Sequence, residues 1–136
     1  PPDWRAGWPN VWLGVSAGHQ ASWDKFVPIL QAVPAALRWV SVEPQIEEIW
    51  PSRATLAGIG RVVIGGESGD LGARPFDTEW ARTLKAGAWA AGARVFVKQM
   101  GSVWARANSA DKRGAGSNPD EWDQDLRVRE FPEVRR

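Results

Sequence analysis

Four short runs rich in β-branched and aromatic residues recur along the chain, and each ends in polar residues. They occupy residues 11–16, 38–43, 61–67 and 94–100, so successive runs begin 27, 23 and 33 residues apart. Such intervals leave room for a helix between two strands and are too long for hairpin turns. We therefore predict an α/β fold of parallel strands with helical crossovers. About four βα units would form half of an eight-stranded barrel of the TIM type.

The connections between the runs carry helix signals. Ser22 is a candidate N-cap for a helix over residues 23–33. Asp77 is a candidate N-cap for a second helix, which Gly92 would end in the C′ position. Between the second and third runs, proline and glycine predict a loop with one helical turn over residues 52–56.

The character of the chain changes after the fourth run. We expect residues 1–102 to form the partial α/β barrel and residues 103–136 to pack on the same domain as a loop and charged tail. Residues 105–120 are rich in small and polar types, which predicts the loop. Tryptophan occurs ten times, and four of the ten are expected in the core: Trp12, Trp39, Trp80 and Trp89.

Residue types that are missing or rare exclude several classes of site. The chain contains no cysteine, which excludes disulfides, thiolate zinc sites, cysteine nucleophiles and iron–sulfur ligands within this sequence. A single histidine, His19, argues against a zinc site built on histidines. The formal net charge of +1 gives no electrostatic case for nucleic-acid binding, although a local basic face remains open. No apolar run reaches the roughly 20 residues needed to span a bilayer, so the predicted location is cytoplasmic.

Polar side chains follow all four runs. In parallel α/β folds the carboxyl ends of the strands meet at one rim, where the functional site usually lies. This reasoning gives ten candidate binding residues: Ser16, His19, Glu43, Gly65, Gly66, Glu67, Ser68, Arg74, Lys98 and Gln99. The alternative interpretation is that they are ordinary solvated strand ends. The pattern names no catalytic residue and no metal ligand.

Two carboxylates and a lysine dominate this set. Glu43 and Glu67 end neighbouring predicted strands, so they either face each other, as an amine or metal site would require, or each pairs with a nearby cation. Lys98 lies in an apolar strand just before a turn. It is a candidate for Schiff-base or anion-binding chemistry, and the alternative is an ion pair with Glu67.

The most informative stretch is the glycine-rich segment 65–75. Its glycines would let the backbone approach a ligand closely, and Ser68 and Arg74 would bind an anion or a carboxylate. The alternative is a glycine-rich turn that needs positive φ. His19, by contrast, is more typical of a loop or capping residue than of a catalyst.

The strand ends resemble successive blocks of the phage protein family called gene product 37 / gene product 68. The resemblance runs in order over nearly the whole chain, and these blocks carry it: 10–16, 38–44, 63–69, 73–75, 96–101 and 121–132. Full-length members of that family have an N-terminal three-cysteine motif that resembles the motif of radical S-adenosylmethionine enzymes. Such a motif would hold a [4Fe–4S] cluster with one iron open to S-adenosylmethionine. The resemblance implies that this chain corresponds to the second half.

The resemblance implies that the chain is part of an enzyme rather than a complete one. The chain would contribute a substrate- or cofactor-facing rim in the cytoplasm of a phage host, and its partner would be a cysteine-bearing N-terminal half or a second copy. The Gly-Gly-Glu run at 65–67 is similar to one that holds the cofactor's amino group in radical enzymes, where it lies much nearer the cysteines. After Ser16 the family usually has an acidic residue and an asparagine, whereas this chain has Ala17, Gly18 and His19.

A second class of function stays open beside this one. The chain would then be a non-catalytic α/β module, or a phage remnant, that acts by binding a partner.

Overall fold

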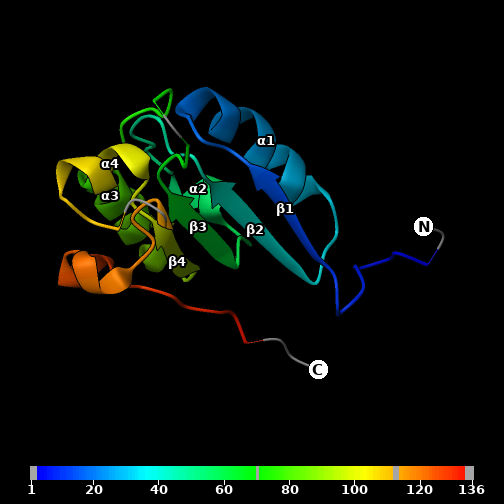
Figure 1. The fold of residues 1–136 in the computed structure, drawn as a ribbon. Helices are drawn as coiled ribbons and strands as arrows, with labels where there is room; N and C mark the ends of the chain where they lie inside the picture. Colours follow the sequence, from blue (N-terminus) through cyan, green and yellow to red (C-terminus); the bar gives the residue numbers. More distant parts are fainter. Residues whose placement is uncertain (1–2, 70, 112–113, 134–136) are drawn as a thin grey trace.

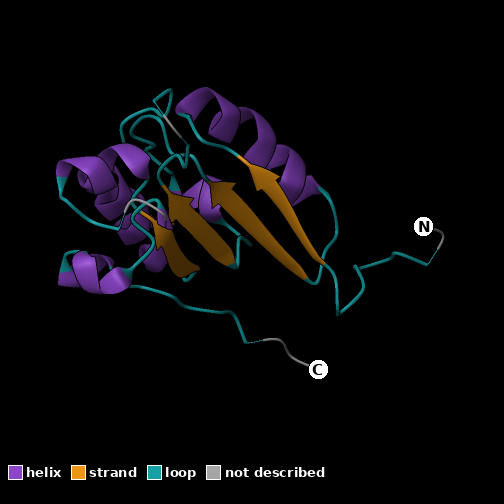
Figure 2. Cartoon of the chain, viewed as in Figure 1, coloured by secondary structure: helices purple, strands orange, loops and turns teal. Residues whose placement is uncertain are grey.

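In the computed structural model, residues 3–69, 71–111 and 114–133 are described. Their strands form one all-parallel sheet with neighbours in chain order (Figures 1 and 2). The strands are β1 (Trp12–Ser16), β2 (Leu37–Val42), β3 (Arg61–Gly65) and β4 (Arg94–Gln99). The prediction of an α/β fold with parallel strands and helical crossovers is confirmed.

Three helices connect the strands, and further helical segments follow the sheet. The connecting helices are α1 (Gln20–Ala32), α2 (Arg53–Leu56) and α3 (Thr78–Ala90). After β4 come α4 (Ser102–Ala107) and two 3-10 turns, η2 (Pro119–Glu121) and η3 (Gln124–Leu126). The loop predicted over residues 105–120 is therefore wrong at its start, because the last turn of α4 extends to Ala107.

Helix α1 begins three residues earlier than the sequence pattern predicts. His19 is the N-cap, and its side chain accepts a hydrogen bond from the backbone N–H of Ser22. The Ser22 hydroxyl in turn accepts from the backbone N–H of His19, which makes a reciprocal capping box. Ser22 therefore acts from the first turn of the helix rather than as its N-cap. The helix also runs unbroken through Pro28.

The other two crossover helices begin where the sequence predicts. Asp77 accepts from the backbone N–H of Glu79 at the start of α3, and Gly92 follows its end with a φ of 82°. A left-handed φ of this kind favours glycine. Ser52 caps the single turn of α2.

The hydrophobic core lies between the sheet and one layer of helices. The register aligns Val40, Val62 and Val95 across three strands, and all three are fully buried. Trp23 of α1 and Leu84 of α3 pack against this layer of valines from the same side. The opposite face of the sheet has no helix layer among the described residues.

Tryptophan burial differs from the prediction. Trp89 is exposed, and Trp12, Trp39 and Trp80 are only partly buried. The fully buried tryptophans among the described residues are Trp23 and Trp122. No helix in the described ranges is long and apolar enough to cross a membrane.

The two edges of the sheet differ. At β4 the C-terminal tail runs antiparallel beside the strand, because Val97 donates its N–H to Val128 and Glu130 donates to Val95. At β1 none of the described residues pairs with the outer edge.

Candidate functional site

A cavity of about 370 Å³ opens at the carboxyl ends of the four strands. Every strand, or the loop that follows it, contributes to its wall. The lining residues are Ser16, Ser41, Glu43, Pro44, Gly66, Glu67, Ser68, Lys98 and Gln99. The parallel direction of the strands is what gathers these polar groups, because it places all four strand ends at one rim.

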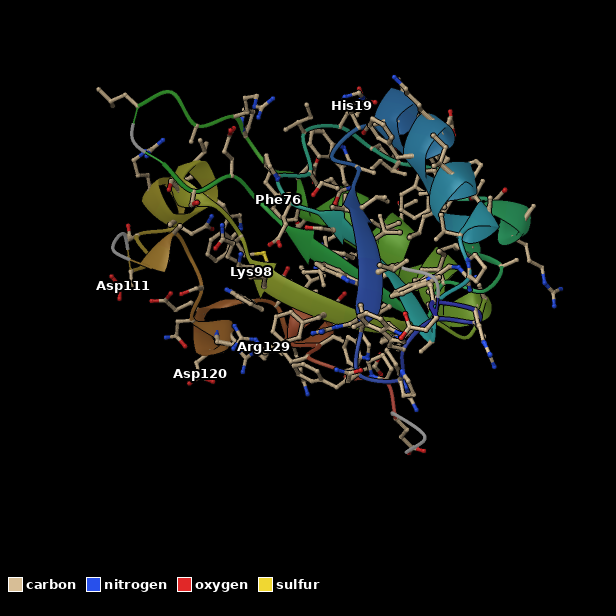
Figure 3. The ribbon with its side chains drawn as sticks, turned by 90° about the vertical axis from the view of Figure 1, so that its right-hand side faces the viewer. His19, Phe76, Lys98, Asp111, Asp120 and Arg129 are labelled. Atoms are coloured by element: carbon tan, nitrogen blue, oxygen red, sulfur yellow. The ribbon has the colours of Figure 1, made fainter. Side chains whose placement is uncertain are left out.

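Seven of the ten predicted residues line this cavity, and the other three lie at its margin or apart from it. Gly65 is at the end of β3, where a Cβ would lie about 3.5 Å from the Gln99 side chain. Arg74 stands beside Glu67 and is not part of the lining. His19 is occupied as the N-cap of α1 and lies apart from Lys98 (Figure 3).

Glu43 and Lys98 form one ion pair at the rim. Lys98 Nζ lies 3.1 Å from Glu43 Oε2, and the lysine side chain is half exposed whereas the glutamate is mostly buried. Ser41 donates its hydroxyl to the other carboxylate oxygen at 3.0 Å. Glu43 Oε2 is shielded from solvent and accepts no hydrogen bond from the described residues, so the lysine contact is electrostatic rather than a well-directed hydrogen bond. This oxygen is therefore a buried acceptor at the cavity whose hydrogen-bonding capacity the described residues leave unfilled.

Glu67 is held much more tightly. Arg74 donates from Nε to Oε2 at 2.7 Å, from Nη2 to Oε1 at 2.8 Å and from its backbone N–H to Oε2 at 2.8 Å. The side-chain hydrogen bonds from Arg74, followed by the backbone one, lower the pKa of Glu67 from 4.5 to about 2. Three of the roughly four acceptor positions of the carboxylate are thus filled. Glu67 organises the glycine-rich loop rather than offering a free carboxylate to the cavity.

This geometry decides between the alternatives that the sequence leaves open. Glu43 and Glu67 each pair with their own cation, and Lys98 pairs with Glu43 rather than with Glu67. Arg74 does bind a carboxylate, but that carboxylate belongs to Glu67 within the same loop.

Close backbone contacts between the segments after β3 and β4 explain the glycines there. A Cβ on Gly66 would overlap the carbonyl group of Met100, and one on Gly101 would lie 3.0 Å from the backbone of Glu67. Ser102 donates its N–H to the Glu67 carbonyl at 2.8 Å, and its hydroxyl accepts from Gly69 at 3.0 Å. The two loops are therefore packed together as one wall of the cavity.

The candidate list omitted two lining residues. Ser41 precedes Glu43 by two positions on β2, so the two-residue period of a strand places both side chains on one face. That alternation is a signal that identifies Ser41. Pro44 joins the lining as the residue after Glu43, and no sequence signal distinguished it.

The described residues contain no group of three or more histidine, aspartate or glutamate side chains arranged to hold a metal ion. The sequence contains no cysteine, so the residues of this chain do not fit a [4Fe–4S] cluster. What the rim offers is a polar cavity with one partly free carboxylate, one half-exposed ammonium group and several hydroxyl groups. Such a set can bind and orient a polar ligand.

A family model described as "Protein of unknown function (DUF5131)" matches residues 2–129. No curated protein and no solved structure matches the chain.

Proposed function

This chain belongs to the DUF5131 family, and we propose that it supplies the C-terminal half of a radical S-adenosylmethionine-like barrel in a phage or prophage protein. Its contribution is a rim that faces substrate or cofactor. It is not catalytically complete alone, because it has no cysteine to hold a cluster. An N-terminal half that bears the cysteines would supply the cluster and the chemistry that depends on it.

The order of the strands supports a barrel wall. A doubly wound sheet reverses its strand order at one point and carries helices on both faces. Here the order is β1-β2-β3-β4 without reversal, and α1 and α3 both contact α2 in a single layer. Right-handed crossovers that always step in the same direction place every helix on one face, as in a barrel.

The open face of the sheet supports the same proposal. Parallel sheets are normally covered on both faces. In this chain Trp39, Arg61 and Phe96 lie on the face opposite the helices and are only partly buried. The ring of Trp39 lies over Gly14, where a Cβ would overlap it. In an open barrel that a preceding half extends from the β1 edge, this face becomes the concave interior, so its incomplete cover is consistent with half of such a barrel.

The single observation that supports ligand binding by this chain is the rim cavity. The polar groups of the cavity whose hydrogen-bonding capacity is only partly used are the Glu43 carboxylate, an acceptor, and the Lys98 ammonium group, a cationic donor. These two groups lie side by side. A ligand with an amino group and a neighbouring acceptor, such as the amino-acid end of S-adenosylmethionine, would match this pair. The engagement of Glu67 by Arg74 argues against a Gly-Gly-Glu role like that of radical enzymes.

Titration of the chain with S-adenosylmethionine by isothermal calorimetry tests this proposal. We expect binding by the wild-type chain and a loss of about tenfold in affinity for Glu43→Gln and for Lys98→Met, since each removes one charge-assisted contact. Glu133→Gln, an exposed carboxylate of the tail, is the matched control and should bind as the wild type does. A wild-type chain that binds no S-adenosylmethionine, or variants that bind equally well, would overturn the proposed rim.

One observation favours a second candidate, a non-catalytic module that binds a partner. Helix α1 exposes Phe26 and Ile29, and its C-cap residue Val33 is exposed as well, which a rim-binding role does not explain. If the rim binds no ligand and these side chains bind protein, the module becomes the better description.

A further inference from the structure

A second cavity, of about 450 Å³, lies where the first turn of α3 meets helix α4. Its volume is in the range that is typical of small-molecule sites. None of its lining residues also lines the rim cavity, so the two cavities are separate candidate sites. The lining residues are Pro75, Phe76, Asp77, Thr78, Trp80 and Trp104.

The walls of this second cavity are held in place by the fold itself. Phe76 is 7% exposed and belongs to the hydrophobic core. Asp77 caps α3 by accepting the backbone N–H of Glu79 at 2.9 Å. Trp104 belongs to α4, and Ser102 at the start of that helix is bonded to the loop that joins β3 to α3. A ligand would therefore have little of the protein to order on binding.

The charge of the cavity favours a cationic ligand. The lining contains one carboxylate, that of Asp77, and no lysine or arginine. Only Oδ1 of Asp77 accepts a hydrogen bond from the described residues, and none of their cations forms an ion pair with this carboxylate. The positive end of the α3 dipole is offset by Asp77 itself and by Glu79 in the first turn. An anion would meet no counter-charge here, whereas a cation would.

The two indole rings of the cavity favour the same class of ligand. Tryptophan is the aromatic residue that binds cations best. Elsewhere the chain provides the cation itself, because Lys85 Nζ lies 5.1 Å from the centre of the Trp89 ring. Over the ranges that the structure describes, no lysine or arginine lies over Trp80 or Trp104, and both side chains are only partly buried. A ligand can supply the cation that these rings lack.

We propose that this cavity binds the guanidinium group of a ligand. A guanidinium ion is flat, so it can stack on an indole ring while the N–H groups at its edge donate to Asp77. The methylene chain that carries the guanidinium group of arginine would contact Pro75 and Phe76. A compact ammonium ion would pair with the carboxylate but would not stack in this way. The site is independent of the function proposed for the rim.

Nuclear magnetic resonance titration of the ¹⁵N-labelled full chain with butylguanidinium tests the proposal. We expect the indole N–H signals of Trp80 and Trp104, assigned with Trp80→Phe and Trp104→Phe, to shift on binding. The signal of Trp50, which is 67% exposed and outside the cavity, should not shift. Butylurea is the matched control ligand, because it has the same shape without the charge. It should bind at least about tenfold more weakly.

Two variants test the contacts separately. Asp77→Asn removes the charge and keeps a good N-cap for α3, so we expect an affinity for butylguanidinium that is about tenfold lower. Asp24→Asn, the same change at an exposed position of α1, is the control and should bind as the wild type does. Trp80→Leu should lower the affinity about fivefold, and circular dichroism checks that it is folded. Equal binding of butylguanidinium and butylurea overturns the proposal, and so does an affinity that Asp77→Asn leaves unchanged.

Two further ligands identify the source of the guanidinium group. Tighter binding of free L-arginine than of N-acetyl-arginine methylamide assigns the site to a small molecule, and equal or weaker binding of free arginine assigns it to a polypeptide. A chain that binds neither overturns the proposal. Glu43→Gln should bind butylguanidinium as the wild type does, and Asp77→Asn should bind S-adenosylmethionine as the wild type does. The failure of one proposal is therefore distinguishable from the failure of the other.

Discussion

The two flanks of the sheet end in opposite ways. At the β4 flank the tail adds an antiparallel segment to the strand and fixes itself to α3, where Arg82 contacts Asp123 at 2.6 Å and Asp125 at 3.0 Å. Leu126 and Trp122 of the tail are buried in the core. At the β1 flank the strand has no neighbour on its outer side within the described ranges, and the adjacent helix α1 exposes Phe26 and Ile29. The first flank is closed by the C-terminal tail, whereas none of the described residues pairs with the outer edge of the second.

This difference distinguishes the two outer edges of the sheet. The tail occupies the outer edge of β4 between Val95 and Val97, so in this structure β4 does not offer that edge to another strand. Among the described residues the outer edge of β1 is unpaired, and it is the edge at which the half-barrel proposal places the preceding half.

Removal of a core side chain from the closed flank should have the largest effect. Leu126→Ala deletes a fully buried side chain that holds the tail, so we expect a loss of about 2–5 kcal/mol in the free energy of unfolding. Ile29→Ala on the open flank removes a side chain that is 56% exposed, so it should cost less than about 1 kcal/mol. Urea unfolding of both variants measures the contrast. Equal losses of unfolding free energy in the two variants would contradict the structural difference between the two flanks.

The sequence predicted the strands, their direction and most of the rim because these depend on local patterns. Val40 and Val42 alternate with Ser41, and Asp77 and Gly92 carry their own helix-end signals. Each of these features can be identified within a few residues of chain.

The ion-pair partners of the rim were not predictable in the same way. The register between β3 and β4 shifts at Gly65, which pairs with Gln99 rather than with Lys98. Meanwhile Arg74 reaches back seven residues to Glu67. Both depend on how two loops pack together. The burial of Trp122 likewise follows from where the tail lies, which no local pattern reports.

The charged contacts of the closed flank should show a pH dependence of intermediate size. Hydrogen bonds from Arg82, and then from Lys85, lower the pKa of Asp125 from 3.8 to about 2. A pKa that is lower in the folded state stabilises the fold above pH 3.8, and this contribution is lost as the pH falls from 3.8 toward 2. Because the Asp125 side chain is 48% exposed, solvent screening limits the contribution to about 1 kcal/mol.

Asp125→Asn should therefore lose about 1 kcal/mol of unfolding free energy at neutral pH and match the wild type near pH 2. Urea unfolding as a function of pH measures both values. Asp3→Asn, at an exposed position far from the tail in sequence, is the control and should follow the wild-type curve. A constant difference between Asp125→Asn and the wild type at all pH values would contradict the assignment to this ion pair.

The smallest effect is expected where the tail reaches from the closed flank onto the open face of the sheet. The guanidinium carbon of Arg61 lies 4.1 Å from the centre of the Phe131 ring and 4.8 Å from that of Phe96, and these two rings meet edge to face with their centres 5.5 Å apart. Burial lowers the pKa of Arg61. Phe131 is itself 61% exposed, which limits the cation–π contribution to about 0.5–1 kcal/mol.

A double-mutant cycle of Phe131→Ala with Arg61→Met, measured by urea unfolding, should give a coupling free energy of about 0.5 kcal/mol. A cycle of Phe131→Ala with Arg38→Met is the control. The Arg38 guanidinium donates to the carbonyl groups of Leu30 and Val33 on the helix side of the sheet, so its coupling to Phe131 should be close to zero. No coupling in the Arg61 cycle would show that the tail covers only the edge of β4. In that case the tail would not cover the sheet face opposite the helices.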